Sequence, residues 1–282
     1  MGLQRGGGCI GRRVVPTATS ASGVWSITEL ESAARDGIWP LTIASPSALP
    51  GLQLWLDGSD AGTLYDATSG GSLVAADGAV LRWEDKSGNG RHFTQATSGI
   101  QPLRKTNVKN GLSAVEFTGD WMSGTYTYTI GTIFVVWNQP TTRSDFTSVV
   151  SARTSGSSKV ANGSLNYNLN TPSVDTVAVD SNPGSVTAVA YRLNRVAITS
   201  ANFVNFATGV SARTSPDRWQ HTSASFTAVT GSKPIVLGAD SFGSTGRTMN
   251  NGHIGEVIAY SGTLTAGQAI AVETYLVNKW GL

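Results

Sequence analysis

Short runs of alternating apolar and polar residues, each followed by turn-forming residues, recur along most of this chain and constrain its fold more than any other feature. From Leu52 to Asp57, three leucines alternate with larger or polar residues, which is the two-residue period of a β-strand. No long helical pattern separates such runs, so a parallel sheet with crossover helices is excluded. The sequence therefore predicts an antiparallel sandwich of two sheets. Further strands are predicted at 80–83, 114–117, 132–137, 148–150, 165–169, 174–179, 188–191, 196–199, 235–238 and 254–260.

The composition agrees with a β-rich protein that has a neutral polar surface. Charged residues make up 13% of the chain, against about 25% in an ordinary soluble domain. The formal net charge of +2 gives no field strong enough to attract nucleic acid or an anionic membrane. We therefore expect neither nucleic acid nor a membrane as a partner.

Cysteine usage and terminal composition indicate where the protein is made. Cys9 is the only cysteine, so no intrachain disulfide can form and a packed core must supply the stability. This favours assembly in a reducing cytosol. The first 13 residues hold no apolar run of signal-peptide length, and no stretch of about 18 apolar residues predicts a membrane span.

Residues 1–45 form a unit separate from the sandwich, which is assigned to 46–282. The segment from Gly2 to Ser22 is too poor in apolar residues to bury a core and is expected to be disordered alone. Ser26 then predicts a helix N-cap with Glu29 as its reciprocal partner and Trp25 before it. The helix is expected to end before Gly37, which suits the left-handed position after a helix.

The apolar stripe of this short helix is large for an element with so little to pack on. It docks either on its own sandwich or on a neighbouring subunit. The arginines of the Gly-rich arm are expected to contact an acidic protein groove or solvent rather than nucleic acid. The residues assigned to docking are Arg5, Arg12, Arg13, Trp25, Leu30 and Trp39.

A second helix is predicted at the end of the sequence. Thr265 can cap it with Gln268 as its partner three residues later. Ile270 and Leu276 follow at helical spacing towards Trp280. The sandwich therefore ends in one helix.

Six sequence fragments occur in a fixed order over about 230 residues. They are Leu54-Trp55-Leu56-Asp57-x-Ser59-Asp60, Trp83-x-Asp85-Lys86-Ser87-Gly88-Asn89-Gly90, Asn110-Gly111-Leu112 with Val115-x-Phe117-x-Gly119, Thr132-Ile133-Phe134, Gly255-Glu256-Val257-Ile258-Ala259-Tyr260, and Tyr275-Leu276-x-x-Lys279-Trp280. Together they resemble the concanavalin A-like, laminin G-like domains of bacterial surface proteins and bacteriophage virion proteins. The resemblance implies an all-β jelly-roll sandwich, here with a short N-terminal arm and helix and a C-terminal helix. The segment 23–40 resembles one found ahead of such domains in phage structural proteins.

The acidic residues do not form the pattern expected of a glycanase. Retaining hydrolysis needs two carboxyl groups about 5 to 5.5 Å apart, which glycanases of this fold supply from one strand face. Glu256 and Glu116 each stand alone on a predicted strand, and the adjacent Glu84 and Asp85 point to opposite faces. The histidines are dispersed, without metal-ligand or triad spacing, at His92, His221 and His253. We therefore predict no enzymatic activity and no catalytic residues.

Two kinds of ligand site remain open. Asp57, Asp60, Asp85 and Asn89 can surround Ca²⁺, because hard cations prefer clustered oxygen ligands. The alternative is that Asp57 and Asp85 fix turns by accepting bonds from nearby backbone amides. Ca²⁺ is the one cofactor that the sequence suggests.

Aromatic residues suggest the second kind of site. Trp121, Tyr167 and Trp219 can stack on sugar rings if they lie exposed, and otherwise belong to the core or an interface. The tryptophans assigned to packing are Trp55, Trp83 and Trp280.

The resemblance and the docking unit together predict a non-enzymatic bacteriophage virion protein, a capsid decoration or a tail or fibre component. Its expected partners are other virion proteins, copies of itself and a host-surface glycan, and its expected location is the virion after assembly in the host cytoplasm. One alternative is a lectin or adhesin without a structural role. The other is a polysaccharide hydrolase of the same fold.

Overall fold

The computed structural model describes residues 41–138, 146–151, 164–171, 174–180, 188–193, 196–198, 204–205, 219–239 and 248–282. The predicted arm and its helix, with all six docking residues, lie outside these ranges.

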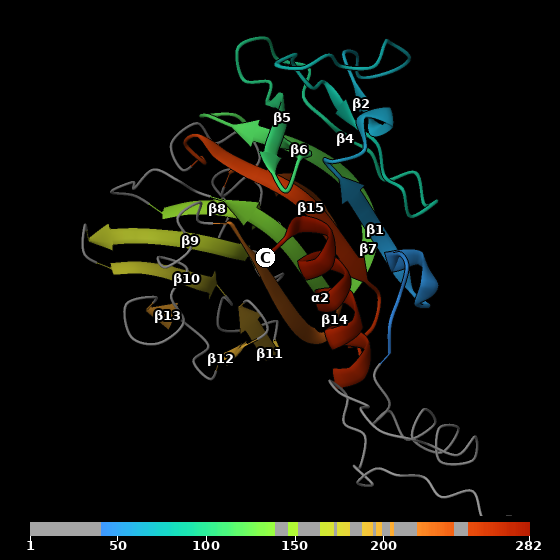
Figure 1. The fold of residues 1–282 in the computed structure, drawn as a ribbon, viewed down its shortest axis with the longest axis vertical. Coiled ribbons are helices and arrows are strands. Elements are labelled where there is room, and N and C mark those ends of the chain that lie inside the picture. The colour runs from blue at the N-terminus through green and yellow to red at the C-terminus, as the bar shows by residue number, and fades with distance from the viewer. Residues whose placement is uncertain are drawn as a thin grey trace, which may run out of the picture.

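The described chain is mostly β-structure with one long helix at its end (Figure 1). Every strand pair among the described residues is antiparallel. The helical elements are η1 (Pro46–Ala48), η2 (Ala61–Thr63) and α2 (Ala266–Trp280). The strands are β1 (Leu52–Asp57), β2 (Leu64–Tyr65), β3 (Arg82–Trp83), β4 (Phe93–Thr94), β5 (Leu103–Lys109), β6 (Leu112–Phe117), β7 (Met122–Asn138), β8 (Phe146–Ser151), β9 (Ser164–Thr171), β10 (Val174–Asp180), β11 (Ala188–Leu193), β12 (Val196–Ile198), β13 (Val204–Asn205), β14 (Trp219–Leu237) and β15 (Gly252–Tyr260).

Two long strands, β7 and β14, pair along most of their lengths and run through both layers of the fold. Their register shifts between Ser225 and Val229 of β14, opposite Gly131 of β7. A bulge of this kind bends a strand pair and increases its twist. Gly131 suits the bend because a Cβ there would overlap the backbone of Gly262. The predicted two antiparallel sheets are therefore confirmed, although the long strands connect them into one hydrogen-bonded network.

Strand β15 lies in the middle of the first layer. It pairs with β7 on one side, and on the other side with β6 at its start and β1 along its remaining length. On the far side of β7, β14 pairs with β11 through its first half and with β8 through its last two residues. Strand β9 pairs with β8, and β10 pairs with β9, which extends the sheet on that side.

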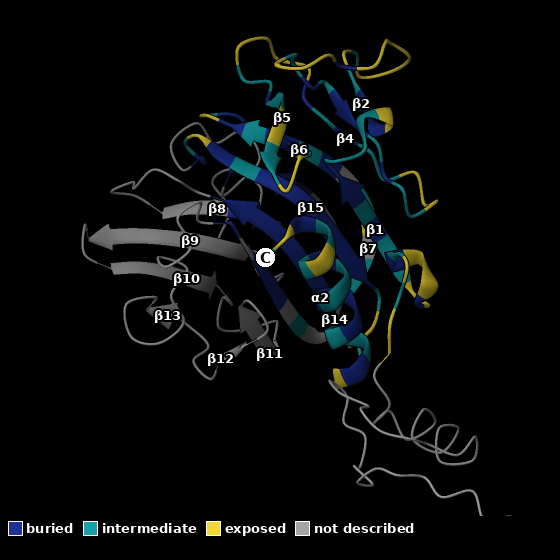
Figure 2. Cartoon of the chain, in the orientation of Figure 1, coloured by how far each residue is buried: buried dark blue, intermediate teal, exposed yellow. Residues whose placement is uncertain are grey.

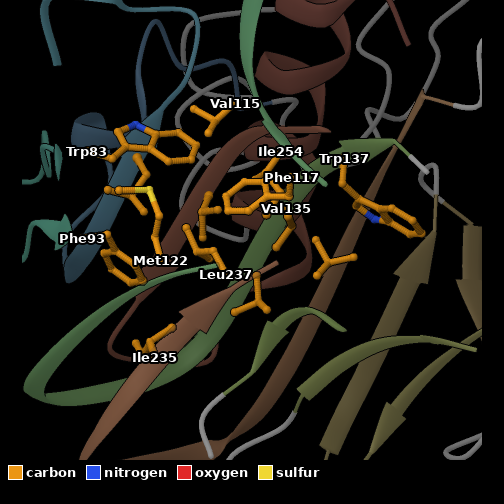
Figure 3. Close-up of a cluster of buried hydrophobic side chains, with 14 of the residues drawn as sticks. Trp83, Phe93, Val115, Phe117, Met122, Val135, Trp137, Ile235, Leu237 and Ile254 are labelled. Carbon is orange, nitrogen blue, oxygen red and sulfur yellow. The ribbon is translucent and has the colours of Figure 1, made fainter. Parts of the chain in front are cut away.

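The main core lies between the two layers and draws on both (Figure 3). Strand β15 is buried along almost its whole length, because the main core covers one face and helix α2 (Ala266–Trp280) covers the other (Figure 2). Trp83 and Phe117 are fully buried in the main core, and Trp83 thus has the packing role expected of it. Such large aromatic side chains supply much of the apolar area removed from water.

Helix α2 covers the outer face of the first layer (Figure 1). Thr265 Oγ1 accepts from Gln268 N at 3.3 Å, and Gln268 Oε1 accepts from Thr265 N at 3.0 Å, so the predicted capping box is confirmed. Gly281, with φ of +65°, ends the helix. Leu276 and Trp280 of α2 pack against outer-face residues of β7 and β15, which makes three layers in all.

Candidate functional site

The polar residues of the sequence fragments converge on one carboxylate, Glu256 of β15, which is fully buried. Its Oε1 accepts hydrogen bonds from Trp55 Nε1 at 2.8 Å and Tyr275 OH at 3.0 Å. Its Oε2 accepts from Lys279 Nζ and Trp280 Nε1, both at 2.8 Å. A carboxylate has about four acceptor positions, and all are used. Glu256 therefore ties β1 and α2 to the centre of the first layer.

A second carboxylate, Asp57 of β1, lies directly opposite Glu256 in the strand register. Lys279 Nζ is 2.7 Å from Asp57 Oδ1, and Lys86 Nζ is 3.0 Å from Asp57 Oδ2. Lys86 also lies 2.7 Å from Asp60 Oδ2. We call these five charged residues the Glu256 network. Its charges alternate in sign, so each buried carboxylate faces at least one ammonium group.

The two buried carboxyl groups have opposite pKa shifts. Burial alone would raise the pKa of Asp57, but the charge and hydrogen bond of Lys279, with Ser59 and Lys86, hold it below its ordinary value. Burial and the charge of Asp57 raise the pKa of Glu256 above its ordinary value, against the opposing effect of Lys279. Neighbouring carboxyls whose pKa values are driven apart are the usual arrangement of an acid and a base in catalysis.

The network predicts a pH-dependent contribution to stability. Because the pKa of folded Asp57 is lowered, Asp57 stabilises the fold above its ordinary pKa of 3.8, and this contribution is lost as the pH falls through the lowered value. The difference in free energy of unfolding between wild type and Asp57→Asn, measured by urea denaturation, should therefore hold down to the ordinary pKa of 3.8 and shrink as the pH falls below it. A difference that stays constant below pH 3.8 would contradict it. Asp77→Asn, at an exposed ion pair, should have little effect at any of these pH values.

The loop from Asp85 to Arg91 covers the free edge of β1. Asp85 Oδ1 accepts from the backbone N of Trp55 at 2.9 Å and of Ser87 at 2.8 Å. Asn89 Nδ2 donates to the carbonyl oxygens of Leu52 and Gln53. These side chains bond to backbone groups at the free edge of β1, which would otherwise be open to pairing with another strand.

These contacts do not fit the predicted calcium site. The carboxylates of Asp57 and Asp60 already contact lysine ammonium groups. The Asp85 carboxylate accepts hydrogen bonds from two backbone amides and the Ser87 hydroxyl. Within the described ranges no three acidic, histidine or cysteine side chains are arranged to hold a metal ion. The turn-fixing alternative describes Asp57 and Asp85, whose carboxylates accept from the backbone N of Ser59 at 3.1 Å and of Ser87 at 2.8 Å. Asp57 and Asp60 also belong to the Glu256 network.

The predicted sugar-stacking tryptophans have no open ring face. Trp219 is 5% exposed and stacks on Trp280 with ring centroids 5.6 Å apart. Trp121 is 8% exposed and packs with Val236. Both tryptophans therefore have the core or interface position that was the alternative to sugar stacking. Tyr167 lies on β9, and its side chain is outside what the structure describes.

A small hollow opens between the layers, at an end of the core that sequence reasoning did not single out. Its apolar lining comes from Leu54, Phe93, Ile130 and Ile235, and it offers about 10 Å³ to a water-sized group. Phe93 and Ile235 lie together at one end of the core, with Trp137 at the other (Figure 3). Ligand pockets have this composition but are usually about 300–1,000 Å³ in volume, so this hollow can take only one small group of a larger ligand that lies outside it.

The rim of the hollow is polar and held by the loop that covers β1. Arg91 Nη1 donates to both the backbone oxygen and Oε1 of Gln53, each at 2.8 Å, and Arg91 N donates to Asp85 Oδ2 at 3.1 Å. Tyr126 OH donates to the backbone oxygen of His92 at 2.6 Å. The one sequence signal for this rim is that Arg91 directly follows the Gly-Asn-Gly turn.

No protein-family model and no curated protein sequence matches the chain. Among solved structures, Trypanosoma rangeli sialidase in complex with sialic acid is similar over 90% of this chain and 40% of its own, with 13% identity and a TM-score of 0.48. An arabinofuranosidase complexed with arabinofuranosyl-alpha-1,2-xylobiose is similar over 82% of this chain and 60% of its own, with 16% identity and a TM-score of 0.41. The chain thus spans 40% of the sialidase and 60% of the arabinofuranosidase, in each case less than two thirds of the neighbour's length.

These neighbours correct two predictions. They are glycosidases rather than virion proteins, which contradicts our interpretation of the chain as a non-enzymatic bacteriophage virion component and our prediction of no enzymatic activity. With TM-scores below 0.5 the neighbours carry no further argument about the fold or the ligand of this chain, which rest on its own residues. No helix in the described part of the chain is long and apolar enough to cross a membrane.

Proposed function

We propose that the chain is a carbohydrate-active protein with a concanavalin A-like jelly-roll sandwich, and that it binds a glycan at the hollow beside Arg91. The observation that carries this proposal is a guanidinium group held in a fixed position next to a concave apolar surface. Sites of this kind combine apolar contact with a few oriented polar groups.

Arg91 is positioned before any ligand arrives. Its backbone is bonded to Asp85 and its Nη1 to Gln53. An arginine side chain has five N–H donors, and those beyond Nη1 have no partner among the described residues. They are therefore available for sugar oxygens, at little further cost in side-chain ordering.

Tyr126 provides an apolar surface at the same rim. Burial raises the pKa of its hydroxyl, with a contribution from the charge of Asp85, so the hydroxyl stays protonated and keeps its bond to His92. The ring is only partly buried. An amphipathic ring with a fixed orientation suits a sugar, which has apolar C–H faces and polar edges.

A glycan array followed by isothermal titration calorimetry tests this proposal. Wild-type protein should bind one class of glycan, and Arg91→Met should bind it at least about tenfold more weakly because the oriented N–H donors are lost. Lys105→Met, on β5, serves as a control for loss of a positive charge and should bind as wild type does. Circular dichroism confirms that both variants fold. Absence of binding across the array, or equal binding by Arg91→Met, would reject the proposal.

Glycoside hydrolysis is a second candidate, favoured by the Asp57–Glu256 pair. Both carboxylates contact Lys279 Nζ, so the contacting oxygens are no more than about 5.5 Å apart, which suits a retaining glycosidase. The raised pKa of Glu256 suits an acid and the lowered pKa of Asp57 a nucleophile. Both groups are buried and fully bonded, so Lys279 must move before a substrate can reach them.

Hydrolysis is tested by incubating the protein with the polysaccharides that it binds and analysing product length. Shortened products that disappear with Glu256→Gln, but persist with Glu116→Gln on the neighbouring strand β6, would support this candidate. Intact polymers after prolonged incubation with wild type would reject it and leave the binding proposal standing.

A further inference from the structure

The floor of the hollow is apolar and has room for one small group. Its 10 Å³ is about the space of a single water-sized group. Four hydrocarbon side chains, those of Leu54, Phe93, Ile130 and Ile235, line it. A bound water needs two to four polar partners, which such a floor does not offer. A methyl group has a similar size and needs none, so it fits the floor better than a water or a sugar hydroxyl.

The rim has polar groups suited to an amide next to that methyl group. Arg91 retains N–H donors for a carbonyl oxygen. Gln53 Oε1 accepts one bond from Arg91, and a carbonyl oxygen has a second lone pair that can accept from an amide N–H. The apolar floor, the Arg91 donors and the Gln53 acceptor therefore lie within one small site.

We propose that the glycan carries an N-acetyl group, whose methyl occupies the hollow while its carbonyl and N–H contact Arg91 and Gln53. This rests on the proposed glycan binding and specifies the class of sugar. Glucose-type or amino sugars without the acetyl group lack the methyl and the carbonyl. Sugars with a longer acyl group exceed the space available.

Matched oligosaccharides test the inference on the unmodified protein. Calorimetry compares the binding of tetramers of N-acetylglucosamine, glucosamine and glucose. The same comparison is made with the corresponding galactose-type sugars. The N-acetylated member of one series should bind at least about tenfold more tightly than its unacetylated partners, from one buried methyl and the added hydrogen bonds. The N-propionyl tetramer should lose most of that preference because its extra methylene overfills the hollow.

The outcomes separate the inference from the function on which it rests. Binding to glycans with no preference for N-acetylated members, or with N-propionyl as strong as N-acetyl, overturns the inference and leaves glycan binding intact. No binding to any glycan overturns both. Ile130→Phe, which narrows the hollow at its partly buried edge, should abolish the N-acetyl preference while weaker binding to unacetylated tetramers persists. An unchanged preference in this variant would also overturn the inference.

Discussion

Replacing Glu256 with glutamine is expected to lower the free energy of unfolding by about 3–5 kcal/mol, the range measured when one partner of a buried ion pair is removed. The carboxylate accepts four hydrogen bonds, one of them from the Lys279 ammonium. A glutamine side chain has one acceptor oxygen and directs an NH₂ group at donors. At least two buried donors then lose their partner, and each costs about 1–3 kcal/mol.

Urea denaturation at neutral pH measures the effect. Glu116→Gln is the matched control, because Glu116 is also a strand glutamate with basic neighbours, the Lys105 ammonium and the His253 imidazole, but its side chain is 19% exposed and those contacts are 3.7 and 3.8 Å. Glu116→Gln should lower the free energy of unfolding by less than about 1 kcal/mol. If Glu256→Gln cost no more than the control, the network would be a marginal contributor to the fold.

Replacing Gly255 with alanine is expected to cost about 1–3 kcal/mol, as overpacking of a tight core does. A Cβ at this position would lie 2.7–3.0 Å from three ring carbons of Trp280. The indole cannot move away freely, because it stacks on Trp219 and its Nε1 donates to Glu256. The strain should therefore loosen the last turn of α2.

Urea denaturation together with tryptophan fluorescence measures this change. Gly262→Ala is the control, since a Cβ there meets nothing within 4 Å and the residue has no positive φ. Gly262→Ala should have the same free energy of unfolding as wild type. Equal stability of the two variants would mean that α2 packs less tightly on β15 than the short Gly255–Trp280 distances indicate.

Features set by neighbouring residues could be predicted from the sequence. Strand β1 follows directly from its alternating leucines, and the N-terminus of α2 follows from Thr265 and Gln268. Both depend on chemistry within a few residues. The strand predicted at 80–83 is shorter, limited to Arg82–Trp83, because Val80 N instead bonds to Pro102 O in a loop.

Features set by pairing across the fold could not be predicted in this way. Glu256 stands alone along its own strand, and its partner Asp57 is supplied by β1 through strand register. Searching within each strand therefore missed the carboxylate pair. The burial of Trp219 likewise depends on stacking with Trp280 of α2, and the hollow exists because Arg91 and Tyr126 meet from a loop and a distant strand.

The contact between Lys279 and Asp57 joins residues that are 222 positions apart in the sequence. During synthesis, β1 emerges from the ribosome long before α2, so Asp57 has Lys86 as its ammonium partner but lacks Lys279 while the first strands form. Contacts of such separation close late and expose unpaired surface in the meantime. We therefore expect the sandwich to reach full stability only after Lys279 and Trp280 have left the exit tunnel.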